Sequence, residues 1–161
     1  MNKSLFKVCS LITMLALMLM AVPMQSAQAL GGGSGSISLT TLGSAYTQDF
    51  NTLANTGTTN SITVINGWFL EEGNVTATAN NGLYASGTGS SATGDTYSFG
   101  AAASSERAFG GLLSGSVSPT IGAQFTNNTG STVTALDISY IGEMWRLGQI
   151  TVGRAADRLD F

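Results

Sequence analysis

Residues 30–161 contain no lysine, no cysteine and no histidine. Both lysines, the single cysteine (Cys9) and all but one of the six methionines lie in residues 1–29. Without histidine or cysteine, residues 30–161 cannot form a Ser-His-Asp or Cys-His catalytic group, a zinc site of the His and Cys type, or a disulfide. Without lysine they cannot form a Walker phosphate-binding loop. These absences argue against catalysis by this part of the chain, and we expect it not to be an enzyme.

The first 29 residues have the three parts of an export signal. Lys3 and Lys7 give a positive start, an apolar run follows at 8–22, and Ala27-Gln28-Ala29 forms a small-x-small cleavage pattern. The apolar run is shorter than the roughly 20 residues that cross a bilayer core. We therefore expect a signal peptide at 1–29 that is cleaved after Ala29, and a product that is secreted or held in the cell envelope with no transmembrane segment after cleavage.

Charge is sparse in the remainder and its balance is acidic. Residues 30–161 carry four arginines against nine carboxylates, which leaves a net charge of −5. An acidic domain repels phosphate backbones, so we expect no binding of nucleic acid through it. The length suits one domain with one core.

Glycine, threonine, serine and asparagine dominate residues 30–161, and all 21 glycines lie there. These are residues of strands and tight turns. Period-two alternation, the mark of a half-buried strand, is clearest at 95–99, where Tyr97 and Phe99 share a face, and at 134–140, where Leu136, Ile138 and Tyr140 do. Further candidate strands lie at 36–41, 45–50, 61–70, 74–79, 123–126, 146–152 and 158–161.

Turn signals separate these runs, at 55–57, 80–82, 118–119 and 127–130. The pattern predicts an all-β fold, as an antiparallel two-sheet sandwich with the jelly roll as one candidate form. A helix at 101–113 is a lesser alternative, which Gly110-Gly111 disfavours. We expect a flexible Gly/Ser-rich lead-in at 30–36 and a β-sandwich domain at 37–161. Because the alternation at 158–161 runs to the last residue, we expect that domain to be truncated at its C-terminal end.

Calcium is the metal that the remaining residue types suit best, because it takes only oxygen ligands. Asp95, Asp157 and Asp160 are the candidate ligands, although no EF-hand or nonapeptide spacing is present. The alternative is that these are solvated aspartates of turns and strand edges. No other cofactor is expected.

A cluster at 143–146 supplies the candidate ligand-binding residues Glu143, Trp145 and Arg146. In a strand, Glu143 and Trp145 would share one face, so the indole could stack on a sugar beside a hydrogen-bonding carboxylate. Trp145 could equally be a core aromatic, since the chain has few large side chains. The neighbouring Glu71 and Glu72 would point to opposite faces if they lie in a strand, and both would be solvated if they lie in a turn.

Six motifs occur in a characteristic order: TQDF at 47–50, GDTYSFG at 94–100, ERAFG at 106–110, FTNNTG at 125–130, GEMWRLG at 142–148 and ADRLDF at 156–161. Together they resemble the N-terminal β-sandwich domain of exported bacterial proteins that carry a PEP-CTERM sorting signal or are similar to modular extracellular nucleases with lamin-tail domains. The resemblance covers most of residues 40–161. It implies a β-sandwich and an exported protein, but no defined activity or ligand residue. Pro119 is the only proline after residue 29, so the Pro-Glu-Pro motif is missing.

Three functions fit these features. The first is a non-catalytic exported module for surface association or for binding a cell-surface or matrix glycan. The second is an accessory N-terminal domain of an exported hydrolase of the nuclease type, with its catalytic module further along the chain. The third is a structural component of an envelope or matrix.

Overall fold

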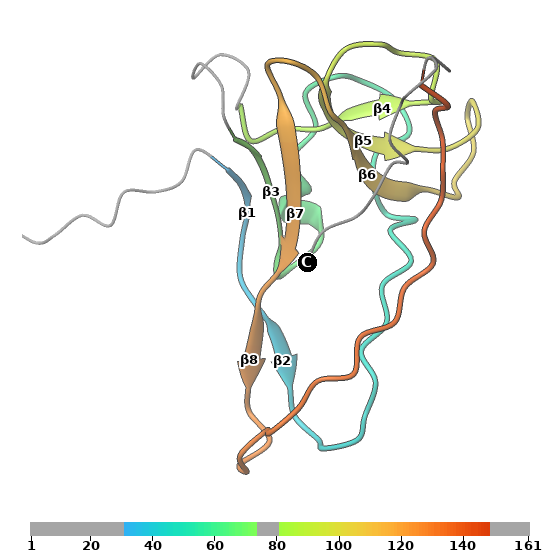
Figure 1. Ribbon diagram of the computed structural model, residues 1–161. Helices are drawn as coiled ribbons and strands as arrows, with labels where there is room; N and C mark the ends of the chain where they lie inside the picture. The colour runs from blue at the N-terminus through green and yellow to red at the C-terminus, as the bar shows by residue number, and fades with distance from the viewer. Residues whose placement is uncertain (1–30, 74–80, 149–161) are drawn as a thin grey trace, which may run out of the picture.

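The structure, a computed structural model, describes residues 31–73 and 81–148 (Figure 1). These ranges are all-β, with one short 3-10 helix, η1 (Ile62–Val64), and no α-helix. The prediction of an all-β fold is thus confirmed, whereas the two-sheet sandwich and the jelly roll stay predictions. The leader at 1–29 and the expected strands at 74–79 and 158–161 lie outside the described residues.

Two three-stranded sheets form the body of the molecule (Figure 1). The first sheet is antiparallel, in the order β1-β3-β7, and consists of β1 (Gly32–Gly33), β3 (Trp68–Gly73) and β7 (Ser118–Ala123). The second has the order β4-β5-β6, with β4 (Ala85–Gly87), β5 (Asp95–Phe99) and β6 (Ala108–Leu112). Strands β5 and β6 pair in antiparallel fashion, and β4 pairs with β5 in parallel.

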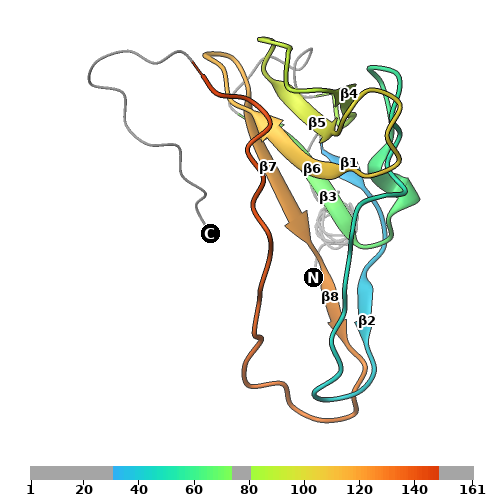
Figure 2. The same cartoon turned by 90° about the vertical axis from the view of Figure 1, so that its right-hand side faces the viewer.

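A third sheet, of only two strands, extends away from the other two (Figure 2). It pairs β2 (Ile37–Leu39) in parallel with β8 (Phe125–Asn127). Period-two alternation identifies a strand but not its partner or direction, so neither parallel pair could be read from the sequence.

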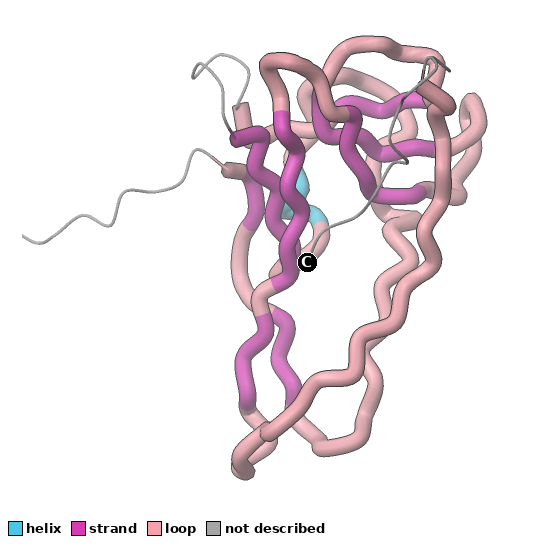
Figure 3. Tube along the Cα trace, viewed as in Figure 1, coloured by secondary structure: helices cyan, strands magenta, loops and turns pink. Residues whose placement is uncertain are grey.

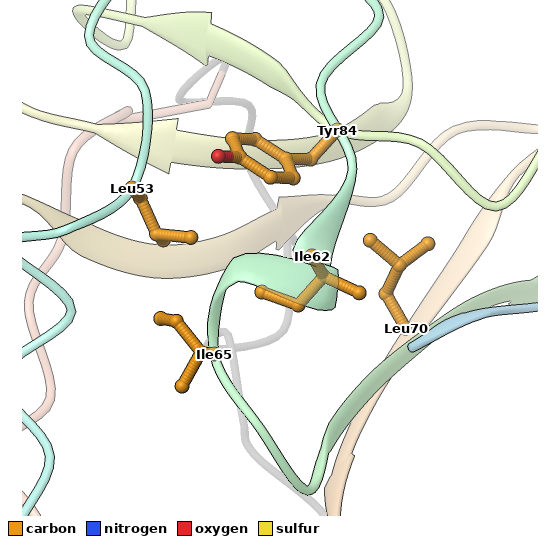
Figure 4. Close-up of a cluster of buried hydrophobic side chains, with 5 residues drawn as sticks. All are labelled: Leu53, Ile62, Ile65, Leu70 and Tyr84. Carbon is orange, nitrogen blue, oxygen red and sulfur yellow. The ribbon is translucent and has the colours of Figure 1, made fainter. Parts of the chain in front are cut away.

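The main core cluster lies where η1 and β3 meet the second sheet (Figure 4). Its members are at most 5% exposed: Leu53, Ile62, Ile65, Leu70 and Tyr84. A second, smaller cluster consists of Ala85, Tyr97 and Phe99. Because Tyr97 and Phe99 share a face of β5, as predicted, Thr96 and Ser98 point to the opposite face, where both are fully buried.

Two predicted strands are absent from the described residues, and a third, at 61–70, forms only in its last part. At 61–67 the Ser61 Oγ accepts a hydrogen bond from the Thr63 N–H at 3.3 Å and starts η1, so β3 begins only at Trp68. The expected strand at 45–50 is not formed, and Phe50 takes a left-handed φ of 61° at its end. The segment 134–140 runs as a loop (Figure 3).

The turn signals were correct at three of their four positions. Gly57, Gly82 and Gly130 all adopt the positive φ that these turns need. Ser118-Pro119 is instead the beginning of β7, an edge strand of the first sheet, where a proline is tolerated. The helical alternative at 101–113 is not adopted, because 108–112 forms β6.

Candidate functional site

The three predicted ligand-binding residues lie together beside the loop that follows β4. The Trp145 Nε1–H donates to the Glu143 Oε2 at 2.9 Å, and the Arg146 guanidinium donates to the Ser90 carbonyl at 3.1 Å. The indole lies parallel to the Phe99 ring, with 6.4 Å between the ring centroids. One face of Trp145 and its N–H are therefore used within the chain, which favours the core alternative for this side chain.

The three predicted calcium ligands do not come together in the described part of the chain. Asp157 and Asp160 lie outside it. Asp95 opens β5, where its Oδ1 accepts the backbone N–H of Thr96 at 2.9 Å. Among the described residues, no group of three or more acidic, histidine or cysteine side chains is placed to hold a metal ion.

Asp95 instead belongs to a buried carboxyl pair with Glu72. Glu72 is fully buried on β3, and its Oε1 accepts the same Thr96 N–H at 2.8 Å, so one donor serves both carboxyl groups. Burial, a hydrogen bond to Glu72 and the charge of that carboxylate raise the pKa of Asp95 from its ordinary 3.8 to about 7. A hydrogen bond between two carboxyl groups requires a proton on one of them, and with a pKa of about 7 Asp95 carries that proton at pH values below about 7.

A buried arginine fastens the second sheet. Arg107 is 2% exposed, and its Nε–H donates to the Ser98 Oγ at 2.8 Å while another guanidinium nitrogen donates to the Ser98 carbonyl. Burial lowers the pKa of Arg107. The Asn51 Oδ1 accepts the Arg107 backbone N–H at 2.9 Å, which connects the 40–60 segment to β6. Sequence reasoning assigned no role to Arg107, because its acceptors are backbone and hydroxyl oxygens that leave no charge pattern.

The first sheet carries a shallow hollow of about 500 Å³, which we call the glycine groove. Four glycines line it, together with four other residues: Gly31, Gly32, Gly33, Gly122, Phe69, Leu70, Glu71 and Thr120. Since Leu70 and Glu72 are buried in the interior, Phe69 and Glu71 belong to the outer face of β3. The register places Gly122 opposite Phe69 and Thr120 opposite Glu71.

The groove exists because glycines line it in place of residues with side chains. A Cβ added to Gly33 would lie 2.4 Å from the Phe69 ring, so that ring occupies space that a larger residue on β1 would fill. A Cβ added to Gly122 would meet nothing within 4 Å, so the floor on the β7 side is open. The result is an aromatic ring, a carboxylate and a hydroxyl on an otherwise bare strip of backbone.

Glu71 and Glu72 lie in β3, so of the two arrangements considered for them the strand holds: Glu71 is exposed and Glu72 fully buried. The groove itself was missed. Gly33 and Gly122 are far apart in the sequence, and they flank the groove because both pair with Phe69 of β3. Residues 30–36 were expected to be a flexible lead-in, and within them Gly32–Gly33 forms β1.

No protein-family model, curated protein or solved structure matches the chain. In the two described ranges, no helix is long and apolar enough to cross a membrane.

Proposed function

We propose that the chain is a non-catalytic, exported β-module that binds glycan in the glycine groove. The observation that carries the proposal is the placement of Phe69, Glu71 and Thr120 side by side on the outer face of the first sheet. A sugar ring offers an apolar C–H face to an aromatic side chain and hydroxyls to polar groups around it. The bare backbone of Gly122 leaves room for such a ring beside Phe69.

The export signal at 1–29 and the resemblance to exported bacterial β-domains support an extracellular or envelope location. The lack of histidine, cysteine and lysine in residues 30–161 supports a role in binding rather than in chemistry. The same groove serves the alternative of an accessory domain in a larger exported hydrolase, because such a domain also contributes binding and no catalytic group.

Binding of the full chain to an array of bacterial and plant polysaccharides tests the proposal. We expect Phe69→Ala to weaken binding by roughly tenfold or more, because hot-spot aromatics contribute at least that much. Gly122→Val should weaken binding as well, since the new side chain fills the open floor while a β-branched residue suits a strand.

Two variants serve as controls. Gly115→Val places the same side chain at an exposed glycine outside the groove, where a Cβ also meets nothing within 4 Å, and should leave binding unchanged. Trp145→Ala distinguishes the two surfaces: full loss with Trp145→Ala and none with Phe69→Ala would move the site to the cluster around Trp145. Failure to bind any glycan would refute the proposal.

A further inference from the structure

The chain contains two asparagines that are followed directly by glycine, in the pairs Asn66-Gly67 and Asn81-Gly82. In both pairs the asparagine is exposed and the glycine is buried, and the glycine φ is positive, at 79° for Gly67 and 68° for Gly82. The two pairs therefore have the same residues and similar exposure. They differ in how their reacting groups are hydrogen-bonded.

An asparagine can lose its side-chain ammonia when the next backbone nitrogen attacks its Cγ and closes a succinimide ring. The reaction is intramolecular, so its rate depends on how the protein holds the nitrogen and the side-chain carbonyl relative to each other. Glycine is the most permissive next residue, because it has no Cβ to obstruct the approach. Both Asn-Gly pairs are therefore chemically capable of this reaction, and the structure decides which of them undergoes it.

Hydrogen bonds hold both reacting groups of Asn66-Gly67. The Gly67 N–H donates to the Ser34 carbonyl at 2.7 Å, and the Asn66 Nδ2–H donates to the Ser36 carbonyl at 2.6 Å. The Gly67 nitrogen must give up its bond to Ser34 before it can lose its proton and attack, which leaves that carbonyl unsatisfied. Reaction at Asn66 therefore requires this turn to open first.

The side chain of Asn81, in contrast, is folded back along the peptide that would attack it. Its Oδ1 accepts the Leu83 N–H at 2.8 Å in an Asx turn, which places the side-chain carbonyl beside the intervening Gly82 nitrogen. The same N–H stabilises the negative charge that develops on Oδ1 when Cγ is attacked. Within 31–73 and 81–148, no backbone carbonyl accepts the Gly82 N–H.

We propose that Asn81 is a site of spontaneous deamidation in the folded protein and that Asn66 is protected from it. Hydroxide removes the Gly82 amide proton, the nitrogen forms a bond to the Asn81 Cγ, and the Cγ–Nδ2 bond breaks as ammonia leaves with a proton from water. Water then opens the succinimide at either carbonyl, which gives aspartate or isoaspartate at position 81.

Either product has a carboxylate in place of a neutral amide. Isoaspartate also lengthens the main chain by a methylene group just before Gly82. The Gly82 carbonyl lies against Gly32 of β1, where an added Cβ would clash with it. Because Gly32 lines the glycine groove, the isoaspartate form alters one edge of that groove.

Incubation of the full chain in heavy-oxygen water at mildly alkaline pH, followed by peptide mapping, tests the proposal. Cleavage by a chymotrypsin-like protease at 68–70 separates the two asparagines. In the folded chain we expect Asn81 to take up heavy oxygen roughly tenfold or more faster than Asn66, because Asn66 reacts only when its turn opens. In urea, where both pairs are freed from their hydrogen bonds, we expect similar rates. Equal uptake in the folded chain, faster uptake at Asn66, or slower uptake at Asn81 in the folded chain than in urea would each overturn the proposal.

Two matched variants locate the reaction. Asn81→Gln keeps a primary amide, but its extra methylene group requires a larger ring that closes far more slowly. We expect the early uptake of heavy oxygen by the intact chain to disappear in Asn81→Gln and to persist in Asn66→Gln, with circular dichroism used to verify that both variants are folded. Early uptake that persists in Asn81→Gln would refute the proposal.

Discussion

Glu72 and Asp95 both accept the backbone N–H of Thr96, and the raised pKa of Asp95 makes the fold less stable as the pH rises. The pKa of Asp95 is about 7 in the folded protein against an ordinary 3.8, so the folded state binds the proton more tightly than the unfolded chain does. By linkage, this group lowers the free energy of unfolding as the pH rises from about 4 to about 7.

Asp95→Asn should remove that dependence, because an amide can donate to Glu72 at any pH. We expect the midpoint of thermal unfolding to fall more for the unmodified chain than for Asp95→Asn between about pH 5 and about pH 8. Equal falls would show that no proton is shared between the two carboxyl groups.

Arg107 is the other buried group whose removal should be severe. Arg107→Met keeps the length of the side chain but leaves the Ser98 hydroxyl and carbonyl without their donors, and we expect a loss of roughly 2–4 kcal/mol in urea unfolding. Arg146→Met is the matched control. Arg146 is only half-buried and donates to loop carbonyls, so its loss should stay below about 1 kcal/mol. Comparable losses would mean that the Arg107 bonds contribute little.

Between η1 and β3, Gly67 adopts a backbone conformation that residues with a side chain disfavour. Its φ is 79°, and an added Cβ would lie 2.7 Å from the Ile37 backbone nitrogen. Gly67→Ala should therefore lower the free energy of unfolding by about 2 kcal/mol or more, since it combines strain with a backbone clash. Gly115→Ala, in open space, should change it by less than about 0.5 kcal/mol. A tolerated Gly67→Ala would mean that the turn can open.

Elements whose own residues alternate were predictable, and elements that exist only through pairing were not. Strand β5 lies at 95–99 as expected, because its aromatic and polar residues alternate. Strands β6 and β7 contain Gly110-Gly111 and Pro119, which read as breakers. They form strands because they complete a register with β5 and β3. The segment 134–140 shows the converse: it alternates well, yet it finds no partner strand among the described residues.

The residue types of the candidate site could be read from the sequence, but their arrangement in space could not. Trp145 and Glu143 do lie in contact, as the spacing suggested, although that segment forms no strand. The groove could not be found in this way. Glycines have no side chains whose pattern in the sequence could indicate a binding surface. Only the pairing of the three strands shows that Phe69 is flanked by Gly33 and Gly122.

The unfolding of the two core clusters can be monitored separately by fluorescence, because a different tryptophan packs against each cluster. Trp68 packs against the first cluster and Trp145 against the second. Strand β5 contributes Phe99 to the second cluster, and Ser98 on its opposite face accepts a hydrogen bond from the buried Arg107. Trp68→Phe and Trp145→Phe each leave a single tryptophan. We expect each variant to show the same urea midpoint by fluorescence as by its own circular dichroism. Distinct midpoints within one variant would mean that the clusters unfold as separate units.

Burial of Arg107 has a consequence for proteolysis. Proteases of trypsin-like specificity cleave after lysine or arginine, and the described ranges offer them only Arg107 and Arg146. Arg107 directly precedes β6 and is buried against Ser98 of β5, so cleavage after it requires this end of β6 to separate from β5. Arg107 is therefore protected from digestion while β6 stays paired with β5. In a chain exported among foreign proteases, as proposed, the rate of cutting at that bond would measure how often β6 separates from β5.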